Sequence, residues 1–186
     1  MELLDIVDQN AQPIGLTIDR DTAHAEGIRH RTSHVWILRR RGGCVEILLQ
    51  KRSKTKDSFP GCYDISSAGH IPAGMDFVPS ALRELKEELG LDAQPAELHY
   101  CGQRRFFNHK IFHDRPFLDN QISNVYVLWK DVRPEDLTLQ ECEVESVRWM
   151  DFFDCMKQVR SKSLPSCIVP EELDIVAVGA GLIRES

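Results

Sequence analysis

Three glutamates, Glu84, Glu87 and Glu88, have the spacing in this sequence that most clearly suggests chemistry. They stand at positions i, i+3 and i+4, so on a helix their carboxylates share one face. Carboxylates this close repel one another unless a cation lies among them, and hard oxygen ligands suit Mg²⁺ or Mn²⁺. For three glutamates alone, a solvated acidic helix face is the ordinary alternative.

The residues around the glutamates predict the helix that must position them. Asp76 is a good N-cap, and Gly90 stands where a C-cap glycine belongs. Before the helix, Gly69 and Gly74 bracket a turn that a β-carbon would hinder. Apolar residues recur at helical spacing and predict the buried face: Ala81, Leu82, Leu85 and Leu89. The sequence therefore predicts a glycine loop followed by a helix.

The whole segment 69–91 resembles the Nudix box, the signature of the Nudix hydrolases. It reads Gly69, five residues, Met75, seven residues, Arg-Glu-Leu, one residue, Glu-Glu, one residue and Gly-Leu. Every fixed position matches except Met75, where the family has a glutamate. A match of this length favours a metal site over a solvated face. The resemblance covers roughly residues 30–160, although only 69–91 is a specific motif.

The resemblance implies a metal-dependent attack on a diphosphate. A diphosphate is densely negative, so bound metal must screen it, orient it and lower the pKa of an attacking water. The implied ligands of Mg²⁺ or Mn²⁺ are Glu84, Glu87 and Glu88. Arg83 corresponds to the motif arginine, which holds a carboxylate in position, and we place it with Glu84 and Glu87 in the catalytic group.

Met75 is the one departure from the motif. A thioether binds hard cations poorly and cannot pair with Arg83. The change would weaken one metal site, shift substrate choice or mark a weakly active protein. Because the three helix glutamates are kept, we expect activity to be retained.

Acidic residues outside the box supply candidates for a further base. Glu143 is the first candidate, because it opens a predicted strand that carries Trp149. Glu145 and Asp119 are rivals, and a surface glutamate at a strand end is the alternative interpretation.

Substrate binding is expected at the glycine loop and at two basic segments. We assign Gly69, His70, Arg52 and Arg104 to the substrate. The basic loop 52–57 would contact phosphate or be merely solvated. Aromatic and basic residues also alternate farther along the chain, where they would stack on a base and hold phosphate or belong to the core: Phe106, Phe107, Phe112 and Phe117, among Arg104, Arg105, Lys110 and Arg115.

Three histidines near the N-terminus, His24, His30 and His34, have a spacing that matches no compact metal-ligand motif. We expect surface or hydrogen-bonding roles for them.

The order of elements favours an α/β layered fold, which the resemblance sharpens to a Nudix-type α/β/α sandwich with a mixed β-sheet. The 186 residues are expected to form a single domain, with an N-terminal extension and hairpin over 1–30 and a C-terminal helix within 161–186. Strands are predicted at 32–39, 44–51, 98–107, 121–130 and 143–150. Within 59–68, a proline–glycine turn is expected to lead into a further strand and then into the glycine loop. Helices are predicted after Asp76, Asp151 and Pro170. Residues 108–120 mix basic, aromatic and polar residues and are assigned to no element.

Composition limits the partners and the compartment. A net charge of −6 argues against general nucleic-acid binding, although bound metal would still admit a phosphate-bearing substrate. The six cysteines form no Cys-x-x-Cys pair. With no signal peptide and no apolar run of membrane-spanning length, we expect a cytoplasmic protein without membrane contact. The expected partner is a small-molecule diphosphate, and a homodimer stays open.

Three functions compete. The first is a divalent-metal-dependent hydrolase of a diphosphate linkage, in a nucleoside diphosphate derivative or similar small molecule. The second is an isomerase, because residues 1–30 and FPGCYDISSAGHIPAG resemble a branch that includes isopentenyl-diphosphate isomerases. That isomerase uses a cysteine directly before the Gly-His pair, where this chain has Ala68, and Cys62 is six residues too early. The third is a non-catalytic module that binds nucleotide or diphosphate, a hypothesis that Met75 supports.

Overall fold

The computed structural model describes residues 2–112 and 115–183, and its centre is a mixed sheet. Strand β3 (His30–Arg41) runs parallel to β8 (Arg115–Trp129) and antiparallel to β4 (Cys44–Arg52) and β6 (Ser67–His70). The remaining strands are β5 (Tyr63–Asp64) and β9 (Val144–Asp151), which pair with β4, and β7 (Leu98–Phe112), which pairs with β8.

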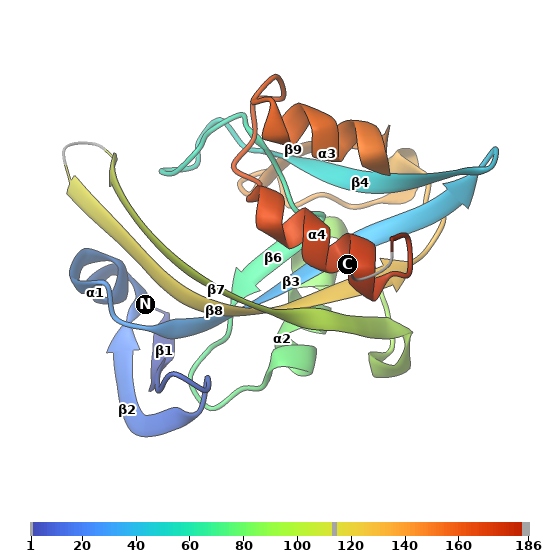
Figure 1. The fold of residues 1–186 in the computed structure, drawn as a ribbon. Helices are drawn as coiled ribbons and strands as arrows, with labels where there is room; N and C mark the ends of the chain where they lie inside the picture. Colours follow the sequence, from blue (N-terminus) through green and yellow to red (C-terminus); the bar gives the residue numbers. More distant parts are fainter. Residues whose placement is uncertain (1, 113–114, 184–186) are drawn as a thin grey trace.

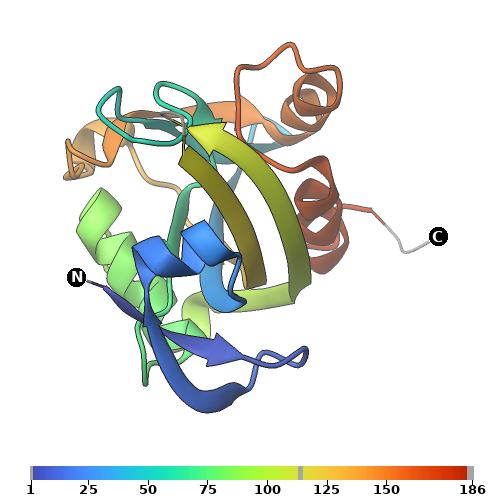
Figure 2. The ribbon, with the colours of Figure 1, turned by 90° about the vertical axis from the view of Figure 1, so that its left-hand side faces the viewer.

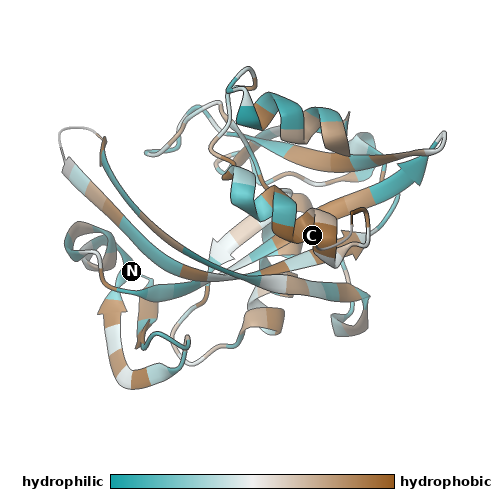
Figure 3. Cartoon of the chain, viewed as in Figure 1, coloured by the Kyte–Doolittle hydropathy of each residue, from teal (hydrophilic) through white to brown (hydrophobic). Residues whose placement is uncertain are grey.

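Helices cover both faces of this sheet (Figure 1). Trp36 and Leu38 of β3 pack in one core cluster with α3 (Phe152–Arg160) and α4 (Pro170–Gly179). The alternate residues Val35 and Ile37 pack in a second cluster with α2 (Phe77–Leu89). A strand buried on both faces reads as a continuous apolar run, as residues 35–38 of β3 do. Figure 3 shows the hydrophobic residues gathered on the central strands and on the covering helices. The predicted α/β/α sandwich with a mixed sheet is confirmed.

The helix of the Nudix-box segment, α2, which is called the box helix below, begins and ends where the sequence predicts. The Asp76 side chain accepts a hydrogen bond from the Phe77 amide, and Gly90 takes a left-handed conformation with φ of 66°. The Asp151 cap of α3 is also confirmed, since its carboxylate accepts bonds from two following amides. Two short 3₁₀ turns lie at Pro95–Glu97 and Pro134–Asp136.

The N-terminal hairpin is also present. It consists of β1 (Leu3–Val7) and β2 (Pro13–Asp19), and α1 (Arg20–Glu26) follows it. Across the parts of the chain that the structure describes, no helix has the length and apolar character that a membrane crossing requires.

Two predicted boundaries are wrong. The predicted strands 98–107 and 121–130 are too short, because β7 runs on to Phe112 and β8 begins at Arg115, and the two pair as a long hairpin that curves past α1 (Figure 2). Polar residues are tolerated in this hairpin because cross-strand backbone pairing, rather than apolar burial, holds its two strands together. The single strand predicted after the proline–glycine turn within 59–68 is broken into β5 and β6. At the break, the Ser66 hydroxyl accepts from the Ile37 amide and donates to the Leu48 carbonyl.

A buried carboxylate joins α4 to the sheet. Glu172 Oε1 accepts hydrogen bonds from His34 Nδ1 and Trp36 Nε1, each at 2.9 Å, and Oε2 lies 2.9 Å from Arg104 Nε. Burial alone raises the pKa of Glu172, but His34, Arg104 and Trp36 outweigh that effect and leave the pKa lowered. The network therefore holds an ionised carboxylate between α4, β3 and β7.

Replacing this carboxylate should destabilise the protein strongly. We expect Glu172→Ala to lower the free energy of unfolding by about 3–5 kcal/mol, because it leaves the buried Arg104 without its counter-ion. Urea unfolding measures this, with the exposed neighbour Glu171→Ala as the matched control. Because the folded pKa is lowered, the stabilisation is present above the ordinary value of 4.5 and is lost as the pH falls through the folded value. A loss no larger than that of Glu171→Ala at neutral pH would contradict the network.

Candidate active site

A cleft of about 630 Å³ opens between α2, the glycine loop, the β7–β8 hairpin and the segment after β4. The structure brings every residue assigned to a site from the sequence into its lining: Arg52, Gly69, His70, Arg83, Glu84, Glu87, Glu88, Arg104 and Glu143. Residues separated by up to 91 positions in the chain thus share one cavity, and what each of them does is treated below as a proposal.

Glu88 locks the box helix onto the strand before it. Its side chain is buried, and Oε2 accepts hydrogen bonds from Ser67 Oγ at 2.7 Å and from the Ala68 amide at 3.2 Å. Burial raises the pKa of Glu88 to about 8, although these two bonds act in the opposite direction. The rotation of α2 about its axis is therefore fixed relative to β6.

Glu84 packs directly on Gly69. A β-carbon added at Gly69 would lie 2.5 Å from Glu84 Oε1, so only glycine admits the carboxylate here. Burial is the main cause that raises the pKa of Glu84 to about 7, against the opposing effect of Arg83. Glu87, by contrast, is half exposed at the cleft edge, with Oε2 3.6 Å from Arg83 Nη1.

The three carboxylates suit a hard divalent cation. All their donor atoms are oxygens, which Mg²⁺ and Mn²⁺ prefer over nitrogen or sulfur. A carboxylate taken out of water favours its neutral form unless positive charge lies beside it. Burial raises the pKa of both Glu84 and Glu88, and at Glu84 the positive charge of Arg83 offsets only part of this effect.

Arg83 supplies part of the positive charge beside the carboxylates. Its Nη2 lies 2.5 Å from Glu84 Oε1 and 3.4 Å from the His70 carbonyl, while its buried Nε has no hydrogen-bond partner. Met75 does not line the cleft, and its carbonyl accepts a 2.8 Å bond from Arg31 Nη2. The methionine is therefore held through its backbone, away from the cavity wall.

The three candidate bases differ in their position relative to the cleft. Glu143 lines the cleft and contacts Lys56 Nζ. Asp119 also lines the cleft, and burial raises its pKa to about 6. Glu145 lies outside the lining and pairs with Lys51 Nζ at 2.9 Å.

The basic residues are only partly available to a ligand. Arg52 is engaged by Asp64 Oδ2 at 2.9 Å and by the Ser58 carbonyl. Arg104 is held by Glu172, but its buried Nη1 has no hydrogen-bond partner. Among the other basic residues predicted for substrate, Lys110 lines the cleft, Arg105 does not, and the Arg115 side chain lies outside the described part.

The aromatic residues divide between cleft and surface. Phe106 and Phe117 line the cleft, and Phe117 stacks on the His24 ring with centroids 4.2 Å apart. Phe107 is 65% exposed, away from the cleft. Phe112 packs edge-on against Phe117 and Phe59. Part of the predicted aromatic surface therefore belongs to packing.

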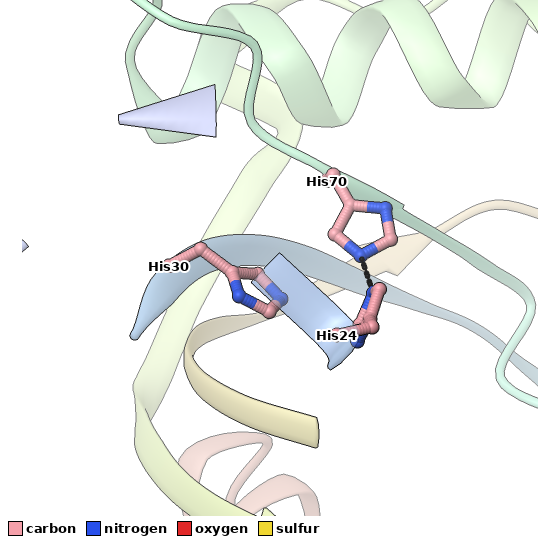
Figure 4. A group of neighbouring side chains, drawn as sticks. All are labelled: His24, His30 and His70. Atoms are coloured by element: carbon pink, nitrogen blue, oxygen red, sulfur yellow. Dashed lines mark hydrogen bonds between the residues drawn. The ribbon is translucent and has the colours of Figure 1, made fainter. Parts of the chain in front are cut away.

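The three N-terminal histidines are buried, so the prediction of surface positions is wrong. The hydrogen-bonding alternative fits His34, which bonds Glu172, and His24, whose Nε2 lies 3.1 Å from His70 Nε2. Sequence spacing missed the meeting of His24 and His30 with His70 (Figure 4), because the third member lies 40 residues beyond the second. Burial and the neighbouring His30 lower the pKa of His24 to about 3.

Comparison with known proteins identifies the family. The NUDIX domain matches residues 28–166, which is most of the chain. The chain belongs to the Nudix family. An uncharacterized Nudix hydrolase of Clostridium acetobutylicum is 38% identical over 143 residues, covering 77% of this chain and 66% of that protein. Nudix hydrolase 3 of Arabidopsis thaliana is 35% identical over 153 residues, covering 81% of this chain but 19% of that longer protein.

Solved structures with low sequence identity to this Nudix protein share its fold. DR0079 from Deinococcus radiodurans has a TM-score of 0.67 at 18% identity and covers 93% of this chain and 98% of its own. A C. elegans Ap4A hydrolase has a TM-score of 0.57 at 18% identity, covering 82% and 98%. The NUDIX domain of Shewanella oneidensis NrtR, complexed with ADP ribose, has a TM-score of 0.57 at 14% identity, covering 89% and 92%.

A methyl group at Gly69 should disturb the carboxylate site without disturbing the backbone. We expect Gly69→Ala to displace Glu84 and to weaken Mg²⁺ or Mn²⁺ binding at least about tenfold, or 1.4 kcal/mol. Isothermal calorimetry measures the affinity. In the control, Gly74→Ala, the new methyl meets no atom within 4 Å, although φ of +77° strains it. Unchanged binding in folded Gly69→Ala would show that Glu84 is not a ligand.

Proposed function

We propose that this protein is a divalent-metal-dependent hydrolase that cleaves a diphosphate linkage in a nucleoside diphosphate derivative or a similar small molecule. The observation that carries the proposal is that Glu84, Glu87 and Glu88 line the cleft from one helix face, with Glu84 packed on Gly69. The family relation supports it, because the similar proteins of Clostridium acetobutylicum and Arabidopsis thaliana are named Nudix hydrolases.

The three glutamates would hold Mg²⁺ or Mn²⁺. When bound, such an ion polarises the phosphoryl oxygens and lowers the pKa of a coordinated water. Glu88 is braced by Ser67 and Ala68, so its oxygen position is set before substrate arrives. Arg83 orients Glu84 and Glu87 through its two terminal nitrogens.

Glu143 is the proposed proton acceptor. It reaches the cleft from the start of β9, and Lys56 on the opposite loop contacts its carboxylate. A general base must lie within hydrogen-bond reach of the proton it takes. Lys56 orients the carboxylate and also adds positive charge beside the incoming diphosphate.

Arg104 and Lys110 form the proposed anion-binding wall. The unpartnered Nη1 of Arg104 and the ammonium of Lys110 belong to the cleft lining opposite the box helix. Arg guanidinium groups bind phosphate oxygens well because their donors have a fixed geometry. The ADP-ribose complex of the Shewanella oneidensis domain and the Ap4A hydrolase of C. elegans make nucleoside phosphates the first compounds to test.

The isomerase alternative lacks its proton donor. Ala68 lines the cleft at the position where that alternative requires a cysteine, and its methyl group transfers no proton. Cys62 is not among the lining residues. Cys167 does line the cleft, but burial raises the pKa of its thiol well above the ordinary value. The non-catalytic alternative rests on Met75 alone.

The six cysteines are free, in agreement with the reducing compartment expected from the sequence. We propose a cytoplasmic protein whose partner is a small-molecule diphosphate, and a homodimer stays a prediction.

A substrate screen tests the reaction class. Nucleoside diphosphate derivatives, including ADP-ribose, and prenyl diphosphates should be incubated with Mg²⁺ or Mn²⁺ and their products separated. We expect phosphoanhydride cleavage of at least one compound and no deuterium exchange into isopentenyl diphosphate. Deuterium incorporation without phosphate products would favour the isomerase. Tight binding of one compound without any turnover would favour the non-catalytic module.

Two neighbouring glutamates provide a matched test of the base. We expect Glu143→Gln to lower kcat about 10²- to 10⁴-fold, because removing a general base has an effect of this size. Glu145→Gln, which changes a carboxylate outside the cleft, should retain nearly all activity. The comparison is kinetic, and metal binding by calorimetry should be similar in both variants. Equal kcat values in the two would exclude Glu143 as the base.

A further inference from the structure

The glycine loop leaves the central sheet before it reaches the box helix. Its first part is held by β3, because the Ile71 amide donates to the Arg31 carbonyl at 3.1 Å. Beyond that point the N-terminal hairpin supports the loop (Figure 1). Pro72 forms an isolated bridge with β1, and the Ala73 amide donates to the Leu3 carbonyl at 2.8 Å. The loop therefore lies between the central sheet and the hairpin.

A buried ion pair holds the last part of the loop. Asp5 Oδ2 accepts hydrogen bonds from the Gly74 amide at 2.9 Å and from Arg31 Nη2 at 3.0 Å. The same nitrogen of Arg31 donates to the Met75 carbonyl at 2.8 Å. The two charged side chains are only 12% and 7% exposed. Hydrogen bonds to ionised groups are stronger than those between neutral groups, so the pair fixes two successive backbone groups of the loop.

Arg31 also reaches the start of the box helix. Its Nη1 lies 4.0 Å from Asp76 Oδ1, and its guanidinium carbon lies 5.4 Å from the centre of the Phe77 ring. Asp76 is the N-cap of α2 and Phe77 is its first residue. Arg31 thus contacts the loop and the helix where they join. Because Glu84 of this helix packs on Gly69 at the other end of the loop, a shift of the junction would change the space that Glu84 occupies.

The same bonds account for the tolerance of methionine at the one position that departs from the Nudix box. They go to the Gly74 amide and the Met75 carbonyl, which are backbone groups. A carbonyl at position 75 is present whatever side chain the residue carries. The loop therefore keeps its support without the motif glutamate.

We propose that Asp5 and Arg31 are positioning residues for the glutamate site, which act through the glycine loop by holding Gly69 and the start of α2 in the arrangement that Glu84 needs. The N-terminal hairpin then belongs to the catalytic unit. This inference rests on the metal site of the proposed function, but the support of the loop itself depends on neither metal nor substrate.

Hydrogen exchange in the metal-free protein tests the support of the loop. We expect Asp5→Ala to speed exchange of the Gly74 amide at least about tenfold, because the variant removes the acceptor of that amide. Two-dimensional NMR measures the rate. The control Asp21→Ala removes an exposed carboxylate and should leave the rate unchanged. An unchanged Gly74 rate in folded Asp5→Ala would overturn the proposal.

Magnesium binding tests the link to the glutamates. We expect Asp5→Ala to weaken Mg²⁺ binding about tenfold, within the range observed when a group that supports metal ligands is lost. Calorimetry well below the Tm of each variant measures the affinity, and Glu87→Gln identifies the binding that belongs to the glutamate site. Met75→Ala should bind Mg²⁺ as the wild type does, because it keeps the carbonyl that Arg31 holds. A merely structural role of Asp5 would lower the Tm and leave the affinity of the folded protein unchanged.

The outcomes separate this inference from the proposed function. Wild-type binding of Mg²⁺ with equal affinity in folded Asp5→Ala would overturn the positioning role alone, as would a loss in Met75→Ala as large as that in Asp5→Ala. Wild-type protein that binds no Mg²⁺ would contradict the metal site, and the positioning role would be lost with it. If Asp5→Ala does not fold, Asp5→Asn decides. It should weaken binding about threefold, because it replaces charged hydrogen bonds with neutral ones, and equal affinity would again overturn the proposal.

Discussion

The hydrogen bonds that Glu88 receives from Ser67 and Ala68 set the geometry on which the candidate active site depends. They join the last turn of the box helix to the strand that precedes the glycine loop. A buried carboxylate must be satisfied by donors, so the helix cannot rotate without leaving it unpaired. Once this contact is made, Glu84 and Glu87 must face the same cleft. The absence of a side chain at Gly69 then provides the space in which Glu84 lies.

The opposite wall depends on a second buried carboxylate. Glu172 holds Arg104, so the guanidinium is fixed before any ligand arrives and one of its nitrogens remains without a partner. The cleft is thus bounded by carboxylates on α2 and by a preorganised cation on β7. Opposite charges across a cavity suit a substrate that binds metal at one side and a guanidinium at the other, as a diphosphate does.

Local features of the chain were predictable, and contacts between distant segments were not. The Asp76 and Gly90 caps, the apolar face of α2 and the continuous burial of β3 are each determined within a few residues. The long hairpin was missed because its outer residues lack a clear apolar alternation. The pairing of Arg52 with Asp64 and the meeting of His24 with His70 depend on tertiary placement, which spacing along one sequence does not reveal.

The central claim is that the three box glutamates form a divalent metal site in the cleft. Anomalous diffraction from crystals soaked in Mn²⁺ tests it most directly, since it locates each ion without any assumption about substrate. We predict a Mn²⁺ peak among Glu84, Glu87 and Glu88, with carboxylate oxygens at about 2.0–2.3 Å. Well-ordered glutamates with no peak beside them, in crystals where Mn²⁺ binds elsewhere in the cleft, would contradict the account.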